Sequence, residues 1–234
     1  MKILAVDTST LSGSVALCTE ERVVAEWSLV SAQTHNRRLL AGVDRILGDA
    51  GWDLEEVDAF AVTVGPGSFT GIRIGLSTLK AMAWALGKPL CGVTTLEALA
   101  APLAVSSLPV CPMVDARKKE IYAALYRPKA PEELIEERPP SALSPEAVLE
   151  WVQEPVWVCG DGWLEYGSML RKRLGDRLLD PGPAYHGIRA AHVGRIALKK
   201  LAAGVPTNPA EIVPTYIRPS EAEINHPHLA RSLA

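Results

Sequence analysis

Short apolar runs that end in polar residues dominate the first part of the chain. The run Lys2 to Asp7 holds four consecutive apolar residues, too few for a helix, and predicts a strand buried on both faces. Residues 14–18 and 22–29 are two further strand-like runs, and the three residues between them suit a hairpin. The pattern therefore predicts three consecutive strands joined as a meander.

Helical spacing begins after these strands. Thr34 suits an N-cap, and apolar positions then recur every three or four residues as far as Gly51. Residues 69–86 predict a second helix and residues 96–103 a short third one, while 59–64 and 90–93 predict strands. Three strands followed by alternating helices and strands form the RNase H-like layout shared by actin, hexokinase and the Hsp70 ATPase domain.

The second half of the chain weakly repeats this opening. Residues 109–114 predict a strand that ends at Asp115, and residues 120–126 predict the next strand, much as Asp7 ends the first strand of the chain. Prolines and glutamates between residues 127 and 145 predict an exposed excursion. The repeat indicates an α/β protein of two RNase H-like lobes with mixed sheets flanked by helices, residues 1–105 and residues 106–234, the second ending in a polar tail.

The remaining elements of the second lobe follow from shorter patterns. Ser144 as N-cap and Pro145 at the first helical position predict a helix that runs to Val152. We further expect a strand over 156–159, helices over 163–173 and 186–203, and a short strand over 211–218.

Composition narrows the class of protein. Hydrophobic residues make up 48% and charged residues 22% of the 234 positions, and no run of about 18 apolar residues is free of charges, glycine or proline. This balance excludes a membrane span and a disordered chain. The first residues lack the pattern of an export signal, so we expect a cytoplasmic location.

Charge and metal-binding residue types exclude further classes. Lys and Arg number 24 and Asp and Glu 27, and the net charge of −3 argues against a protein that binds nucleic acid by itself. The four cysteines are widely spaced in apolar runs, so we expect them to be buried and reduced. The five histidines show no zinc-ligand spacing, and we expect no metal site.

A glycine-rich loop carries the main question of chemistry. Gly65, Gly67 and Ser68 lie between a strand and a helix, where glycines admit a ligand and the helix N-terminus attracts an anion. In an RNase H-like fold, Asp7, Thr8 and Ser9 face the same cleft, so these six residues form a candidate nucleotide or phosphate site. The loop has no Walker lysine, and the alternative is a tight turn with close helix packing.

A two-metal nuclease does not fit these positions. RNase H chemistry needs several carboxylates around two cations, and Asp7 supplies one. The fourth strand, where another is expected, ends instead in Val64, Gly65 and Pro66.

Two motifs identify a family. The segments ILAVDTST at residues 3–10 and GPGSFTGIRIG at residues 65–75 closely resemble the TsaB (YeaZ) family of bacterial tRNA threonylcarbamoyladenosine biosynthesis proteins. The resemblance implies an actin-like ATPase fold without catalytic activity of its own, which dimerises with the catalytic subunit TsaD. With TsaE and a threonylcarbamoyl-adenylate synthase, that pair modifies N6 of adenosine 37 in tRNAs reading codons that start with A.

The same resemblance sets the expected cofactors and partners. It implies no cofactor of the chain's own, with ATP or ADP at or near the partner interface, a homodimer in isolation, and tRNA met only through the complex. In TsaD a His-x-x-x-His turn binds the metal, and the matching positions here are Thr95 and Leu99, which cannot ligate it in the same way. The alternative function is a self-sufficient ATP-dependent phosphotransferase or ATPase that uses Asp7.

A partner surface is expected on the first two helices. In the second helix Ile72, Leu76, Leu79, Ala83 and Leu86 repeat at core spacing. A second stripe is small, and with two positions of the first helix it forms the predicted partner interface: Leu39, Val43, Gly71, Gly75, Thr78 and Met82. The alternative is that these small residues pack inside the same chain.

Overall fold

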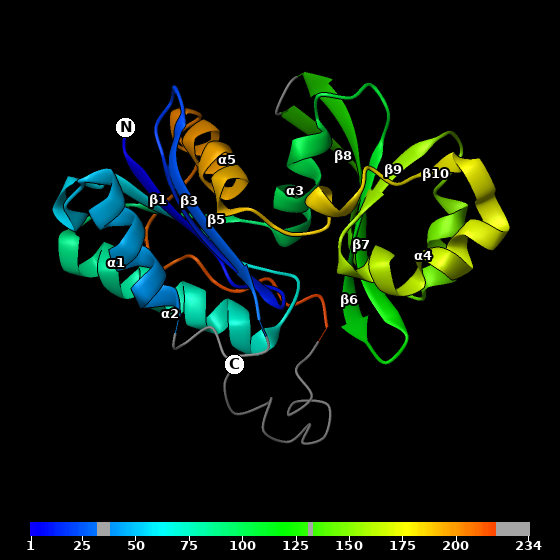
Figure 1. The fold of residues 1–234 in the computed structure, drawn as a ribbon, viewed down its shortest axis with the longest axis horizontal. Helices are drawn as coiled ribbons and strands as arrows, with labels where there is room; N and C mark the ends of the chain where they lie inside the picture. The colour runs from blue at the N-terminus through cyan, green and yellow to red at the C-terminus, as the bar shows by residue number, and fades with distance from the viewer. Residues whose placement is uncertain (32–37, 131–132, 219–234) are drawn as a thin grey trace.

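The computed structural model describes residues 1–31, 38–130 and 133–218, and it forms two lobes that each hold one five-stranded sheet (Figure 1). The two sheets confirm the predicted class, an α/β protein with mixed sheets flanked by helices. Thr34, the predicted N-cap of the first helix, lies outside the described residues, and that helix is observed from Leu39.

The first sheet contains the predicted meander. Its strands are β1 (Ile3–Asp7), β2 (Ser12–Cys18), β3 (Val23–Val30), β4 (Ala59–Thr63) and β5 (Leu90–Val93), in the order β3-β2-β1-β4-β5. β1, β2 and β3 pair antiparallel, whereas β4 and β5 join in parallel. Leu4 and Val6 enter one hydrophobic core and Ile3 and Ala5 another, as expected for a strand covered on both faces.

Helices cover both faces of this sheet (Figure 1). α1 (Leu39–Ala50) and α2 (Phe69–Leu86) pack on one face, and α5 (Ala190–Ala202) packs on the other, while η2 (Leu54–Glu56) links α1 to β4. Ser68 caps α2, because its Oγ accepts a hydrogen bond from Gly71 N at 3.2 Å. Among the described helices, none has the length and apolar character needed to cross a membrane.

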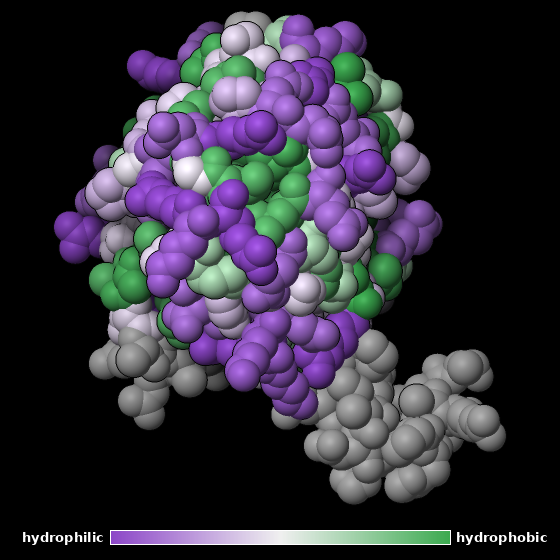
Figure 2. Space-filling view, turned by 90° about the vertical axis from the view of Figure 1, so that its right-hand side faces the viewer, coloured by the Kyte–Doolittle hydropathy of each residue, from purple (hydrophilic) through white to green (hydrophobic). Residues whose placement is uncertain are grey.

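The second sheet forms the other lobe. Its strands are β6 (Val110–Arg117), β7 (Glu120–Ala130), β8 (Glu133–Leu143), β9 (Val156–Cys159) and β10 (Leu178–Leu179), in the order β10-β9-β6-β7-β8. Its outer face is covered by α4 (Asp161–Leu174) and η4 (Pro145–Glu150). η5 (Gly175–Arg177) and η6 (Pro183–Tyr185) are single turns. Seen from this end, the lobe is hydrophilic around one hydrophobic hollow (Figure 2).

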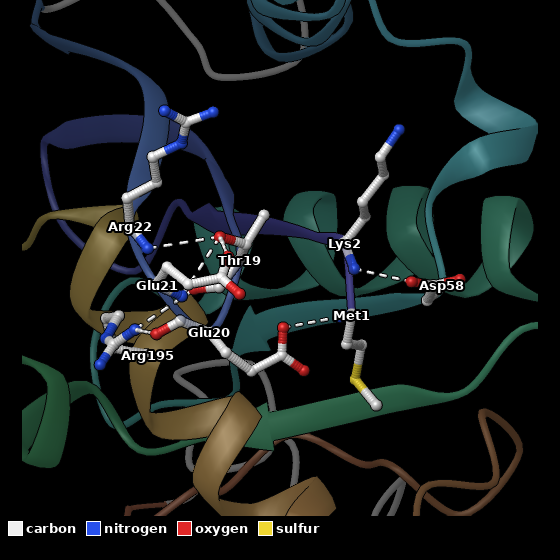
Figure 3. Close-up of polar contacts among 8 residues, drawn as sticks. All are labelled: Met1, Lys2, Thr19, Glu20, Glu21, Arg22, Asp58 and Arg195. Atoms are coloured by element: carbon white, nitrogen blue, oxygen red, sulfur yellow. Dashed lines mark hydrogen bonds and ion pairs between the residues drawn. The ribbon is translucent and has the colours of Figure 1, made fainter.

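The chain returns to the first lobe after leaving the second. α5 packs on β1 and β2, and Arg195 Nη1 donates to the carbonyls of Thr19 at 3.2 Å and Glu20 at 2.5 Å in the β2–β3 turn (Figure 3). Residues 205–218 also lie against the first lobe. α5 and most of the segment after it therefore pack with the first lobe, although the expected division at residue 105 assigned them to the second.

One hydrophobic core joins the two lobes. It includes Ala5 and Val93 of the first sheet, Val114 and Ala124 of the second, and the buried side of α3 (Thr95–Ala100). η3 (Ala101–Leu103) follows α3 and leads into β6. The inner faces of both sheets therefore share a single apolar layer in which α3 and α5 lie.

Four expectations about secondary structure differ from the structure. The described residues of 127–145 are mostly exposed, as predicted, but they form the end of β7 and the edge strand β8 rather than a loop. An edge strand tolerates Pro139 and Pro140 because one of its sides is unpaired. The helix from Pro145 to Val152 is the shorter 3₁₀ turn η4. Residues 211–218 form no strand, and the long helix expected from residue 186 begins at Ala190.

Candidate functional site

The Asp7 carboxylate is fully buried at the end of β1. Its Oδ1 accepts hydrogen bonds from Ser9 N at 3.1 Å, Ser9 Oγ at 2.6 Å and Thr63 Oγ1 at 2.8 Å. Three donors from the chain's own loop and from β4 hold this oxygen and fix the turn that follows β1. The structure thus brings Asp7 and Ser9 into contact, and these bonds give the Oδ1 atom a structural role.

The glycines of the β4–α2 loop are closed by the chain's own atoms. A Cβ added at Gly67 would lie 2.2 Å from Ser9 O, and one added at Gly71 would lie 2.0 Å from Thr8 O. A Cβ at Gly75 would lie 2.3 Å from Thr8 Oγ1. The loop carrying Thr8 and Ser9 is therefore packed directly on the first two turns of α2, which only glycine permits.

Gly65 has a different neighbour. Its φ of +112° is in the region that favours glycine, and an added Cβ would lie 2.7 Å from Thr215 O. Thr215 N also donates to Val64 O at 2.7 Å. The first glycine of the motif is thus covered by residues near the C-terminal end of the described chain.

The hollow described beside Asp7 is much smaller than a nucleotide. The hollow lined by Asp7, Thr8, Ser14 and Trp27 has a volume of about 10 Å³, which is the room of about one water molecule. Close packing within the chain already accounts for the glycines of the loop. Phosphate contact therefore stays a prediction for Asp7, Thr8, Ser9, Gly65, Gly67 and Ser68.

The predicted interface residues lie mostly inside the chain. Leu39 and Val43 are 4% and 1% exposed and belong to the core of the first lobe, and Gly71 and Gly75 are buried against Thr8. Thr78 and Met82 are half-buried. At the four buried positions, packing within the chain accounts for the residue, and a partner interface there stays a prediction.

The same two helices expose other apolar residues that the sequence stripes did not select. Trp84 on α2 is 76% exposed and Leu40 on α1 is 52% exposed. Leu40 follows the core position Leu39 by one residue, and Trp84 lies outside the core stripe of α2. Both are large apolar residues that fall outside the helical repeat of the buried positions, and this mismatch in the sequence could have identified them.

Thr95 and Leu99, the two positions that the resemblance to TsaD singled out, are buried. They lie on α3 and are 0% and 1% exposed, and Leu99 belongs to the core shared by the lobes. The four cysteines are also buried, as predicted, and burial raises the pKa of Cys18 and of Cys111 to about 12. In residues 1–31, 38–130 and 133–218, no cluster of three His, Cys, Asp or Glu side chains is placed to hold a metal ion.

The second lobe has polar features of its own. Asp115 N donates to Asp161 Oδ1 at 2.9 Å, and burial together with the nearby Asp115 carboxylate raises the pKa of Asp161. A pocket of about 410 Å³ has an apolar floor that includes Leu125 and Val156. On its rim, Arg127 binds the carboxylates of two glutamates, Glu137 and Glu154. None of the predicted site residues lines this pocket.

Comparison with known proteins identifies the family. The model of the TsaD family, tRNA N6-adenosine threonylcarbamoyltransferase, matches residues 29–149. The Bacillus subtilis tRNA threonylcarbamoyladenosine biosynthesis protein TsaB is 31% identical over 95% of this chain and 96% of its own length. The Escherichia coli protein of the same name is 37% identical over 70% of this chain and 72% of its own.

A solved structure agrees with these relatives. YeaZ from Pseudomonas aeruginosa superposes with a TM-score of 0.79 at 32% identity, over 92% of this chain and 99% of that one. Sequence and fold therefore match over nearly the whole length. The chain belongs to the TsaB (YeaZ) family and has a role in tRNA threonylcarbamoyladenosine biosynthesis.

Proposed function

We propose that this chain is the non-catalytic, partner-activating subunit required for N6-threonylcarbamoyladenosine formation at adenosine 37 of tRNAs that read ANN codons. It acts by dimerising with the catalytic subunit TsaD, with TsaE as a further component, and it pairs with a second copy of itself in isolation. The net charge of −3 supports contact with tRNA through the complex rather than by this chain alone.

The exposed apolar residues on α1 and α2 carry the proposal. Both helices cover the same face of the first sheet, so their outer sides form one layer (Figure 1). Trp84 is 76% exposed and Leu40 is 52% exposed on that layer. A large aromatic side chain without cover on a helix is a common anchor of a protein interface.

Residue chemistry supports a non-catalytic role. Thr95 and Leu99 occupy the positions of the metal-binding histidines of TsaD, and neither supplies a nitrogen ligand. Asp7 has three hydrogen-bond donors of its own chain on one oxygen. The proposal places ATP or ADP at or near the partner interface, away from the closed glycines of α2.

Reconstitution of adenosine-37 modification with and without this chain tests the proposal. We expect TsaD with TsaE and the synthase to modify tRNA only when this chain is present. Trp84→Ala should weaken TsaD binding by about 10- to 30-fold, which corresponds to a typical interface anchor. Isothermal titration calorimetry measures this binding. When the concentration of this chain is limiting, the rate of tRNA modification should fall by a similar factor.

Leu164→Ala is the matched control, because Leu164 is 64% exposed on α4 of the second lobe and should leave TsaD binding unchanged. Equal modification without this chain would refute the activating role. The rival function, a self-sufficient ATPase, predicts ATP turnover by the purified chain that Asp7→Ala abolishes in a variant that still folds.

A further inference from the structure

Residues 205–218 cross the first lobe without forming a helix or strand. Thr207 O accepts from Leu90 N at 2.9 Å on the edge strand β5, and Lys80 Nζ donates to Ala210 O at 3.4 Å. Ile212 packs against the core of the first lobe, close to Gly92. We call residues 205–218 the strap.

The strap ends in an aromatic anchor on α2. The rings of Tyr216 and Phe69 are stacked with centroids 4.8 Å apart, and Arg73 Nε donates to Tyr216 Oη at 2.8 Å. The Arg73 guanidinium also lies over the Phe69 ring at 3.7 Å. Two contacts of different kinds therefore hold one side chain in place.

The first lobe is shaped to receive the strap. A Cβ at Gly65 would lie 2.7 Å from Thr215 O, and one at Gly92 would lie 3.3 Å from Ile212 Cγ2 and 2.9 Å from Val64 Cγ1. Larger side chains at these two positions would displace the strap or its neighbours. The strap therefore packs closely on the first lobe at both glycines.

The strap then reaches the second lobe. Arg218 Nη1 donates to Glu120 Oε2 at 2.7 Å, and Glu120 is the first residue of β7. The core shared by the lobes includes Ala124 and Tyr126, and Tyr122 packs against that core. All three residues follow Glu120 on β7, so the ion pair holds this strand at its first residue, outside the shared core.

We propose that residues 205–218 form a strap that holds the two lobes in one relative orientation, with Tyr216 anchoring it to α2 and Arg218 latching it to Glu120. The shared core acts as the pivot and the latch restrains rotation about it. The strap also covers Gly65, the first glycine of the predicted phosphate loop. The inference is independent of the proposed function, because the isolated chain tests it.

Hydrogen exchange tests the anchor. The Thr215 and Leu90 amides bond to Val64 O and Thr207 O, so they report the closed strap. We expect Tyr216→Ala to raise exchange in peptides covering residues 205–218 by at least 10-fold, with unchanged exchange in α4. Unchanged exchange over 205–218 would overturn the anchor.

Spin labels on Ser77→Cys and Ser168→Cys test the latch, because these exposed serines lie on α2 and α4 and the four native cysteines are buried. Arg218→Glu should broaden the distance distribution between the labels, with a rise in strap exchange of about 2- to 5-fold, since a partly exposed ion pair is a weak contact. Adding Glu120→Arg should restore both readouts.

Lys129→Glu is the control, since it reverses a charge in the Lys129–Glu133 pair, which lies within the second lobe. It should change neither the label distances nor the exchange of the strap. A distance distribution unchanged by Arg218→Glu, or changed equally by the control, would overturn the latch.

Discussion

The packing of Thr8 on α2 predicts that Gly71→Ala destabilises the isolated chain. An added Cβ would lie 2.0 Å from Thr8 O and 3.2 Å from the Thr8 carbonyl carbon. Ordinary Cβ contacts begin near 3.4 Å, so either the backbone of the β1–β2 loop or the start of α2 must move. The atom in the way is a backbone carbonyl, which no rotamer change relieves.

The magnitude follows from three opposing effects. Overpacking by one methyl group costs about 1–3 kcal/mol. Displacing Thr8 also weakens the bond from Thr8 Oγ1 to Gly71 O, which is 2.8 Å long and worth about 1 kcal/mol. Alanine offsets about 0.5–1 kcal/mol through its better helix propensity. The net loss is about 1–3 kcal/mol, and the Tm should fall by about 3–10 °C in a chain of this size.

Thermal unfolding followed by circular dichroism measures the change. Gly48→Ala is the matched control, because Gly48 lies in α1 with nothing within 4 Å of an added Cβ. That substitution should raise the Tm by about 1–4 °C through helix propensity alone. If Gly71→Ala raised the Tm as Gly48→Ala does, the close approach of Thr8 to α2 would be wrong, and a partner would again be the reason for the glycine.

Two further predictions concern buried ionisable groups. Because burial raises the pKa of Cys18 and of Cys111 to about 12, we expect no thiol of the native chain to react with DTNB within minutes near pH 8 and all four to react in guanidinium; a fast native thiol would show that a cysteine is accessible. Burial raises the pKa of Asp161 in the folded chain. At a pH above that pKa the buried carboxylate is ionised and destabilises the folded state, and this destabilisation decreases as the pH falls through the folded pKa. Asp161→Asn keeps an oxygen for Asp115 N and should raise the Tm more near pH 7.5 than near pH 4.5, and an equal change at both would contradict the shift.

Local pattern was enough to predict most of the first sheet. The strand β1 is a short continuous apolar run, and both of its faces are covered, by α1 and α2 on one side and by α5 on the other. The edge strand β8 was missed because its residues alternate weakly, carry glutamates and include Pro139 and Pro140. Those features are typical of loops, and only pairing with β7 makes them a strand.

Long-range packing explains what the sequence could not predict. The return of α5 and the strap to the first lobe depends on contacts between residues more than 100 positions apart, such as Ser14 Oγ accepting from Ala190 N at 2.9 Å. No local periodicity encodes such a pairing. The contact between Gly65 and Thr215 is also long-range. It explains why the first position of the motif is a glycine, which the neighbouring residues in the sequence do not explain.

The helix α2 shows why small residues alone do not locate a partner. At about 100° per residue, Gly71, Gly75, Thr78 and Met82 centre about 130° around the helix from the stripe Thr70, Arg73, Ser77, Ala81 and Trp84. That second stripe is exposed along its whole length, and it ends in the exposed Trp84. A glycine on a helix indicates that another segment packs closely against that position. In α2 this segment is the loop that carries Thr8. Arg73 in the exposed stripe already holds Tyr216 of the strap, so the proposed partner surface on α2 consists of the exposed residues Ser77, Ala81 and Trp84.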